Sequence, residues 1–428
     1  MYVKDGNEYY LCIDLKSFYA SVECVERGLD PMTTNLVVAD PERGGGTLCL
    51  AISPSMKKLG VKNRCRVYEI PGNIEYITAP PRMQLYIDYM ARIYSVYLDY
   101  ISPDDIHVYS IDEAFLYISP YLRKYDMSPR EMAQFLMDRV SMEVGVRATC
   151  GIGTNLYLTK IALDIISKHA PDFIGYLDEK LYIEKLWNHR PLTDFWRIGP
   201  GIQARLARIG IHDMEGIARA DEDLLYEIFG IDAELLIDHA YGRETARMED
   251  IKKYEPKSNS ISSGQVLLRD YSTSEARLIV KEMTDLVCLD MVERHKNTSS
   301  ISLYIGYSHT VSALPSGGTV SFLKRTNADM IIIPEIVRLY DSIVKEGLPV
   351  RRIGINCNNI LDADAPYQMD IFSLGLCRKE DKNNRIQKAV IDIKKRFGKD
   401  AILKGMNYEE AGMTIKRNHQ IGGHKSGL

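Results

Sequence analysis

The chain has 428 residues, of which 45% are hydrophobic and 26% are charged, and these values are ordinary for a soluble globular protein. A length of this order predicts about three domains, each large enough for a core of its own. No apolar run approaches the roughly 20 residues that a membrane helix needs, and the first residues lack the layout of a signal peptide. We therefore expect a cytoplasmic protein.

The eight cysteines are scattered, without a C-x-x-C pair, which favours reduced thiols over disulfides or a zinc site. The net charge of −4 is unevenly divided. Residues 257–428 hold 25 Lys and Arg against 19 Asp and Glu, which gives +6, and residues 1–256 hold 29 against 39, which gives −10. A basic C-terminal part could neutralise phosphates, and an acidic N-terminal part offers carboxylates for cations. A solvated charged surface would give the same sums.

The first part of the chain has the pattern of an α/β unit. An apolar strand at residues 9–13 leads into Asp14, and a helix is predicted over residues 18–26. Residues 31–72 resemble a small inserted unit, with a short strand, a glycine turn at 44–46, a strand at 48–52 and a basic helix from about residue 54. The further predicted elements are a helix at 81–102, strands at 106–111 and 114–118, a helix at 131–144, a strand at 149–153 and a helix at 156–168.

The second part of the chain changes character. Residues 178–247 are predicted to form short helices separated by glycine turns, and residues 248–258 have the composition of a tether. After the tether, the pattern predicts a compact α+β domain. Its elements are a strand, a helix, two strands, a helix and a strand, at residues 260–267, 272–295, 300–308, 319–325, 328–345 and 352–360.

Three carboxylates are notable because each lies at the end of an apolar strand or at the junction between two strands. Asp14 ends the first strand, and the adjacent pair Asp112 and Glu113 lies at a strand junction, where a hairpin tip would let both reach one site. Phosphoryl transfer to a hydroxyl uses two divalent cations about 4 Å apart, and hard oxygen ligands suit magnesium. The alternative is that these residues are ordinary surface acids at strand ends.

The sequences around these acids form specific motifs. Residues 13–23, Ile-Asp-Leu-Lys-Ser-Phe-Tyr-Ala-Ser-Val-Glu, and residues 109–115, Tyr-Ser-Ile-Asp-Glu-Ala-Phe, closely resemble the two signature motifs of the Y-family DNA polymerases, nearest to the UmuC-like bacterial branch. The resemblance implies an α+β multidomain, right-hand polymerase with palm, small fingers, a helical thumb and a C-terminal α+β little finger. The implied boundaries are palm 1–30 and 76–177, fingers 31–75, thumb 178–247, linker 248–258, little finger 259–361, and a clamp-binding segment with a C-terminal helix and tail at 362–428.

The resemblance also implies roles for single residues. Asp14, Asp112 and Glu113, with the main-chain carbonyl of Leu15, would hold two Mg²⁺ ions as cofactors. Phe18 and Tyr19 would contact the nucleotide, and Tyr19 would be a steric gate whose ring clashes with a 2′-hydroxyl. The alternative for Tyr19 is a core aromatic on an amphipathic helix.

Lysines are the expected partners of the nucleotide's triphosphate. Lys160 lies where the family has a lysine that contacts the triphosphate. The alternative is that Lys160 is an ordinary solvated lysine on a helix. Lys57 stands where many members carry arginine. Pro54 stands where many members have a phosphate-contacting tyrosine, so this chain departs from the family in the fingers.

DNA contacts are implied in two places. Residues 198–202, Ile-Gly-Pro-Gly-Ile, resemble a helix-hairpin-helix, in which Ile198, Gly199 and Gly201 would let the backbone approach a phosphate. In the little finger, Lys324 and Arg325 are the expected DNA-binding residues.

A short segment after the last predicted strand resembles the bacterial motif that docks into the sliding clamp. Its residues are Gln368, Met369, Asp370, Ile371 and Phe372. Two apolar side chains in a polar tail suit a partner's pocket, and the alternative is a hydrophobic staple onto the same domain.

The resemblance thus implies a low-fidelity DNA polymerase for translesion synthesis, with no room in the assigned domains for a proofreading exonuclease. Its expected partners are primer-template DNA, deoxynucleoside triphosphates and the sliding clamp, with a UmuD-like accessory subunit as a further candidate, and its expected place is the nucleoid. Two rival interpretations are a palm-fold nucleotidyl cyclase and a clamp-recruited DNA-binding scaffold without activity.

Overall fold

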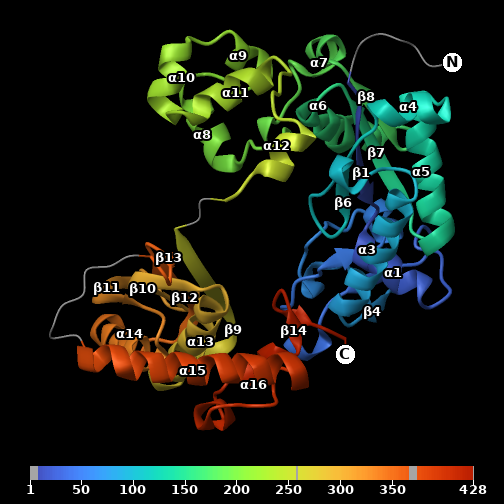
Figure 1. The fold of residues 1–428 in the computed structure, drawn as a ribbon. Helices are drawn as coiled ribbons and strands as arrows, with labels where there is room; N and C mark the ends of the chain where they lie inside the picture. The colour runs from blue at the N-terminus through green and yellow to red at the C-terminus, as the bar shows by residue number, and fades with distance from the viewer. Residues whose placement is uncertain (1–7, 257–258, 366–373, 428) are drawn as a thin grey trace. The chain divides into compact units, whose positions relative to one another are not determined.

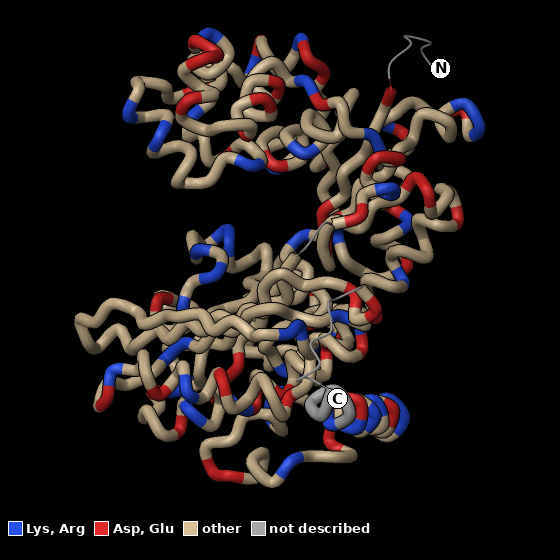
Figure 2. Tube along the Cα trace, turned by 60° about the vertical axis from the view of Figure 1, so that its left-hand side comes forward, with Lys and Arg blue, Asp and Glu red and all other residues tan. Residues whose placement is uncertain are grey.

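The computed structural model describes residues 8–256, 259–365 and 374–427 (Figure 1). The chain divides into two compact units. Unit 1 comprises residues 1–254 together with 424–428, and unit 2 comprises residues 255–423. Acidic and basic residues are interspersed along the chain trace of both units (Figure 2). Within the described residues, no helix is long and apolar enough to cross a membrane.

Unit 1 is built on a five-stranded sheet with the order β5-β6-β1-β7-β8. The central strand β1 (Tyr10–Leu15) pairs antiparallel with β6 (Glu113–Tyr117) and β7 (Ala148–Gly153), and β7 pairs parallel with β8 (Ile174–Leu177). The edge strand is β5 (Ile106–Val108), which forms a hairpin with β6. Side chains on both faces of β1 are buried, as expected for a sheet that is covered on both sides.

Helices cover this sheet. Tyr10 and Cys12 pack with Leu156, Leu163 and Met248, so α6 (Leu156–Ile161), the π-helical turn η4 (Ala162–Ile166) and α12 (Met248–Lys253) lie on one face. The remaining helices of this region are α1 (Phe18–Val25), α3 (Met83–Leu98), α4 (Ser119–Tyr125) and α5 (Pro129–Val144). The start of α5 follows from its sequence, because Ser128 and Glu131 form a capping box with Pro129 in the first turn.

Glycines allow α6 and η4 to touch the sheet with their backbones. A Cβ added to Gly151 would overlap the carbonyl oxygen of Thr159, and a Cβ on Gly153 would overlap the amide of the same residue. A Cβ on Gly175 in β8 would lie 2.5 Å from the carbonyl oxygen of Ala162. This close approach determines the distance between α6 and the sheet.

The segment expected to be a small inserted unit has its own sheet. Its strands β2 (Leu36–Val38), β3 (Ala51–Ile52) and β4 (Ile77–Ala79) have the order β3-β2-β4, and α2 (Pro54–Lys58) follows β3. A separate small core lies beneath it, formed by Val37, Ala39, Cys49, Ile52, Met56, Val61, Cys65 and Ile70.

Short helices follow β8, as predicted. They are α7 (Glu179–Leu186), α8 (Pro200–Arg208), α9 (Met214–Ala218), α10 (Glu222–Phe229) and α11 (Asp232–Ala240). Their core includes Tyr157 and Leu158 of α6, so they pack directly on the α/β part of unit 1.

Unit 2 is a sheet with the order β11-β10-β12-β9, covered on one face by helices. Its strands are β9 (Ser260–Tyr271), β10 (Lys296–Tyr307), β11 (Ser316–Thr326), β12 (Val350–Asn358) and the short β13 (Leu361–Asp362). The helices α13 (Thr273–Glu293) and α14 (Asp329–Ile343) pack on the sheet, and α15 (Leu374–Phe397) lies against α13. The unit also contains α16 (Thr414–Asn418) and β14 (Gln420–Ile421), and β15 (His424–Lys425) belongs to unit 1.

Four of the differences between the predicted elements and the structure are prominent. The strand expected at 48–52 is limited to Ala51–Ile52, with Leu48 in a single bridge to Arg66. The helix expected at 81–102 ends at Leu98, before the turn that Pro103 begins. The single helix expected at 156–168 is interrupted by the π turn.

The tether expected at residues 248–258 is the fourth difference. It begins as α12, because Met248 is buried against the sheet and the Asp250 carboxylate accepts a hydrogen bond from the amide of Arg247 at 2.9 Å. An anchored, capped turn of this kind is stable as a helix.

A substitution tests the close approach of α6 to β7. Gly151→Ala should destabilise the protein by roughly 2–4 kcal/mol, because the added methyl group meets backbone that cannot move aside. Urea unfolding followed by circular dichroism measures this change. Gly72→Ala, whose methyl group would meet open space, is the matched control. Equal stability of both variants would contradict the backbone contact.

Candidate active site

The fold brings the three predicted carboxylates together. Asp14 lies directly opposite Glu113 in the register of β1 and β6, and the amide of Leu15 donates to the carbonyl oxygen of Asp112 at 2.9 Å. The β5–β6 hairpin turns just before this point, since the amides of Tyr109 and Ser110 both donate to the carbonyl oxygen of Glu113. The acidic pair therefore lies at the end of a hairpin, as predicted.

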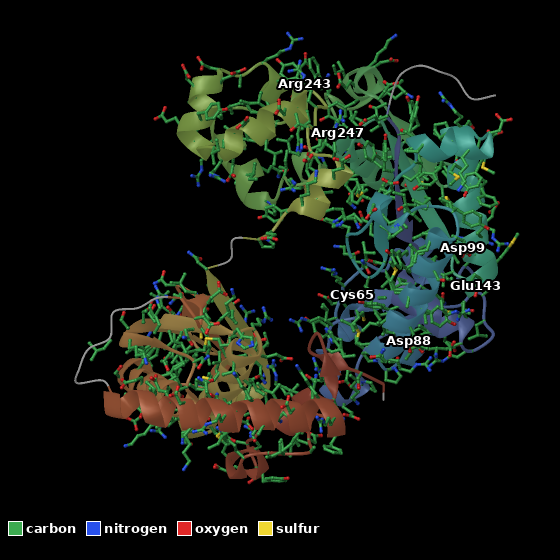
Figure 3. The ribbon with its side chains drawn as sticks, viewed as in Figure 1. Cys65, Asp88, Asp99, Glu143, Arg243 and Arg247 are labelled. Carbon is green, nitrogen blue, oxygen red and sulfur yellow. The ribbon has the colours of Figure 1, made fainter. Side chains whose placement is uncertain are left out.

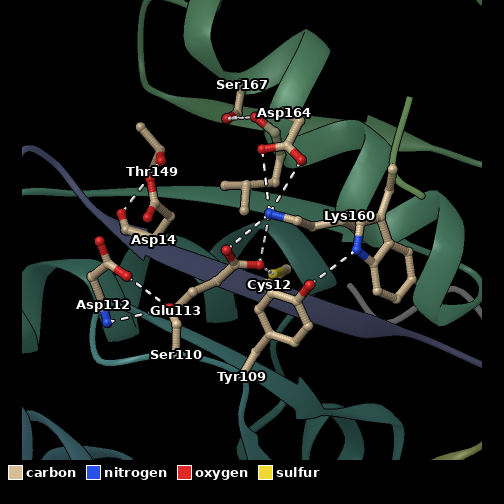
Figure 4. A network of polar contacts seen from close by, with 12 residues as sticks. Cys12, Asp14, Tyr109, Ser110, Asp112, Glu113, Thr149, Lys160, Asp164 and Ser167 are labelled. Atoms are coloured by element: carbon tan, nitrogen blue, oxygen red, sulfur yellow. Dashed lines mark hydrogen bonds and ion pairs between the residues drawn. The ribbon is translucent and has the colours of Figure 1, made fainter. Parts of the chain in front are cut away.

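Glu113 is held in a buried ion pair. The Lys160 ammonium lies 2.8 Å from its carboxylate and 3.1 Å from that of Asp164, and the Cys12 thiol donates to it at 3.1 Å (Figure 4). Lys160 and Glu113 are only 7% and 8% exposed. Burial lowers the pKa of Lys160, but its ion pairs with Asp164 and Glu113 outweigh this effect and raise the pKa above its usual range. Lys160 is thus a partner of Glu113 and Asp164.

The other two acids have different surroundings. Asp112 accepts a hydrogen bond from the Ser110 hydroxyl at 2.7 Å. Burial raises the pKa of Asp14 to about 7, and the nearby charges of Asp112 and Glu113 contribute in the same direction. Negative charge is therefore not fully compensated here by the protein's own cations.

This donor set fits a hard divalent cation. Carboxylate oxygens are the ligands that magnesium prefers, and a cation would relieve the repulsion that raises the pKa of Asp14. Among the described residues, however, no group of three or more His, Cys, Asp or Glu side chains is already arranged around a common point. Glu113 turns towards Lys160 and Asp112 towards Ser110, which accounts for this.

The two predicted nucleotide-contacting aromatics begin α1. The Phe18 ring is buried, so a contact to a ligand would come from its main chain. Tyr19 is half-buried and stacks on Tyr86, with ring centroids 4.4 Å apart and planes 18° apart. Burial raises the pKa of Tyr19, and the charge of Asp112 raises it further.

A buried network supports Tyr86. Its hydroxyl donates to Glu23 at 2.8 Å, and the Arg82 guanidinium donates to both oxygens of the same carboxylate at 2.9 and 2.7 Å. Glu23 and Tyr86 are fully buried. The ring behind Tyr19 is therefore fixed on one side by hydrogen bonds.

Two lysines face the acidic cluster. Burial lowers the pKa of Lys57 in α2, Lys168 lowers it further, and the charges of Asp14 and Asp112 oppose this change. Sequence reasoning missed Lys168, although a lysine at the end of the helix that carries Lys160 was a usable signal. Its ammonium is 3.5 Å from Asp164 and its side chain is half exposed. Pro54 is buried in the first turn of α2.

The predicted DNA-contacting residues lie in both units. Gly199 caps α8, and a Cβ on Gly199 or Gly201 would meet no atom within 4 Å, so the backbone is accessible there. Ile198 is buried. The element before α8 is a single 3₁₀ turn, Leu192–Asp194, where a helix-hairpin-helix would have a helix.

In unit 2 the two predicted cations lie on β11. Lys324 forms an ion pair with Glu380 at 2.8 Å, and the Arg325 guanidinium donates to the carbonyl oxygen of Asn359. The predicted clamp-binding residues 368–372 lie outside the described residues.

Known proteins resemble the whole chain. Residues 13–164 match the impB/mucB/samB family, and residues 258–371 match the C-terminal domain of that family. The putative UV-damage repair protein UvrX of Bacillus subtilis is 32% identical, with 97% of each chain covered, and DNA polymerase IV 2 of the same organism is 31% identical, with 96% of this chain and 97% of the relative covered.

A solved structure has the same fold. It is a Y-family DNA polymerase chimera, Dbh-Dpo4(243-245)-Dbh, with a TM-score of 0.63 and 19% identity over 83% of this chain and 99% of that one. The α+β multidomain architecture predicted from the sequence is thereby confirmed. The chain belongs to the Y-family of DNA polymerases and is a DNA-directed DNA polymerase.

Proposed function

We propose that this polymerase adds deoxynucleotides to a primer 3′-hydroxyl by two-metal phosphoryl transfer, with low fidelity, during translesion synthesis. The observation that carries the proposal is the placement of Asp14 opposite Glu113, with Asp112 beside them. Asp14, Asp112, Glu113 and the Leu15 carbonyl would hold two Mg²⁺ ions. When bound, these ions polarise the triphosphate and lower the pKa of the attacking hydroxyl.

The chain's own cations have two separate tasks in this proposal. Lys57 and Lys168 belong to different elements, interact electrostatically with Asp14, and would bind the triphosphate of the incoming nucleotide. Lys160 was expected to contact the triphosphate, but its ammonium is already paired with Glu113 and Asp164. We assign it to holding the Glu113 carboxylate in place.

Tyr19 would select the sugar. Its ring is backed by Tyr86, so it cannot move away from a nucleotide that carries a 2′-hydroxyl without breaking the stack. A clash built against the wrong substrate gives selectivity without any added attraction for the right one.

The remaining assignments rest on the family resemblance. The main chain at Gly199 and Gly201 would contact a DNA phosphate, with Phe18, Lys324 and Arg325 in the roles expected from the sequence. Residues 368–372 would bind the sliding clamp, and a UmuD-like subunit and the SOS response are further parts of the proposal. UvrX bears the name of a UV-damage repair protein, which supports a role in damage tolerance.

Primer extension tests the central claim against the alternative of an inactive DNA-binding scaffold. Asp112→Asn and Glu113→Gln should each slow single-nucleotide addition by about 10³-fold or more, because each removes a charge that would face the metals, worth several kcal/mol. Primer-template affinity should change little. Asp99→Asn, at the exposed end of α3, is the control (Figure 3). Extension at the normal rate by either active-site variant would refute the metal role.

The raised pKa of Asp14 predicts a pH dependence of metal binding. The carboxyl is protonated below about pH 7 and must lose that proton to bind a cation. The apparent Mg²⁺ affinity should therefore fall by about tenfold per pH unit below pH 7 and level off above pH 8. Calorimetric titration with Mg²⁺ at pH 6, 7 and 8 measures it. Asp14→Asn should bind more weakly at every pH and lose this dependence, and a pH-independent affinity of the unmodified chain would count against the proposal.

Sugar selection can be measured directly. Tyr19→Ala should lower the ratio of kcat/KM for deoxy- over ribonucleotide by at least about tenfold, equivalent to the loss of one steric clash. Tyr19→Phe keeps the ring and should keep the ratio. A ratio that Tyr19→Ala leaves unchanged would exclude the gate.

A further inference from the structure

The first turn of α3 lacks a cap from its own sequence. Arg82 occupies the N-cap position, but its side chain makes no capping hydrogen bond and is committed to Glu23. The first amides of a helix have no partner within the helix and need an acceptor from elsewhere. The Gln84 side-chain amide donates to the Asp88 carboxylate, one turn further along the helix, at 2.9 Å.

The acceptor comes from a segment about 340 residues later in the chain. The amide of Gln84 donates to the main-chain carbonyl oxygen of Ser426 at 2.9 Å. Ser426 is 5% exposed, and residues 424–428 belong to unit 1. We name residues 424–427 the tail segment.

The backbone of the tail segment lies directly against Arg82. Gly427 has a φ of +82°, and a Cβ at this position would be 2.7 Å from the Cβ and 2.8 Å from the Cα of Arg82. Only glycine combines this conformation with this approach. Lys425 adds a charged contact, with its ammonium 2.6 Å from Glu42 in the 3₁₀ turn Pro41–Arg43 and 3.4 Å from Asp40, the N-cap residue of that turn.

The capped first turn of α3 contains Tyr86, whose ring supports the proposed gate, Tyr19. The amide of Tyr86 bonds to the carbonyl oxygen of Arg82, and the Tyr86 ring stacks on Tyr19. A change at the start of α3 would therefore reach Tyr19 through one intervening residue.

We propose that the tail segment is an N-terminal cap of α3, supplied in cis, and that it positions Tyr86 and thereby Tyr19. The second half of this inference rests on the proposed role of Tyr19 as the gate. The tail segment is thus a positioning element of the nucleotide site, although it contains none of the residues assigned to the chemistry.

Hydrogen–deuterium exchange tests the cap without any substrate. The full chain is compared with three variants. The first ends at Gly423, the second carries Lys425→Glu, and the third, the charge exchange, carries Lys425→Glu together with Glu42→Lys. Peptides covering residues 82–90 should exchange about fivefold faster in the truncated chain, the effect of losing one helix cap. Lys425→Glu should fall between, and the charge exchange should restore protection. Lys416→Glu, an exposed lysine of α16, should behave like the full chain.

The coupling to the gate needs a second measurement on the same variants. The truncated chain should show a several-fold lower ratio of kcat/KM for deoxy- over ribonucleotide, with unchanged primer-template affinity, and the charge exchange should restore the ratio. Equal exchange rates at 82–90 in the full and truncated chains would overturn the cap. Faster exchange with an unchanged ratio would overturn the coupling to Tyr19. If the full chain itself extends no primer, the proposed function fails, and the exchange data still decide whether the cap exists.

Discussion

The buried ion pair between Lys160 and Glu113 is the interaction on which the arrangement of the site depends. Both charged groups are almost excluded from water. Removing either partner would leave an uncompensated buried charge, which costs free energy of folding. The pair therefore ties α6 to the start of β6. It can form because Gly151 and Gly153 let α6 lie in backbone contact with β7. The placement of the Glu113 carboxylate, which we propose to be catalytic, thus depends on two residues that have no side chain.

The same pair explains why the three acids are not equivalent. Glu113 has an ammonium partner, Asp112 has a hydroxyl, and Asp14 has mainly the negative charges of the other two. Burial, together with this repulsion, raises the pKa of Asp14 to about 7. A site in which one carboxylate is paired with an ammonium group and another is repelled by its neighbours is suited to a cation, and the pairing spares the buried Glu113 an uncompensated charge.

Much of this could be predicted from the sequence. The apolar strand before Asp14, and the hairpin that carries Asp112 and Glu113, are local patterns, and antiparallel pairing then brings the acids together. The partner of Lys160 could not be predicted, because it depends on the height of α6 above the sheet and on the π turn that follows. The hydrogen bond from Gln84 to Ser426 was equally hidden, since no local pattern connects positions so far apart in the chain. Residues 248–253 were expected to be a tether because Lys252 and Lys253 are prominent, whereas burial of Met248 decides their structure.

The π turn at residues 162–166 has a consequence for comparing this chain with its relatives. A π turn holds one residue more than the α-helical turn that it replaces, and such turns recur at functional sites. An insertion of one residue between Lys160 and Lys168 can therefore be absorbed as a local bulge, while both ammonium groups keep their positions. The π turn also shifts the helical register between Lys160 and Lys168, so their relative directions do not follow from counting residues along an ordinary α-helix.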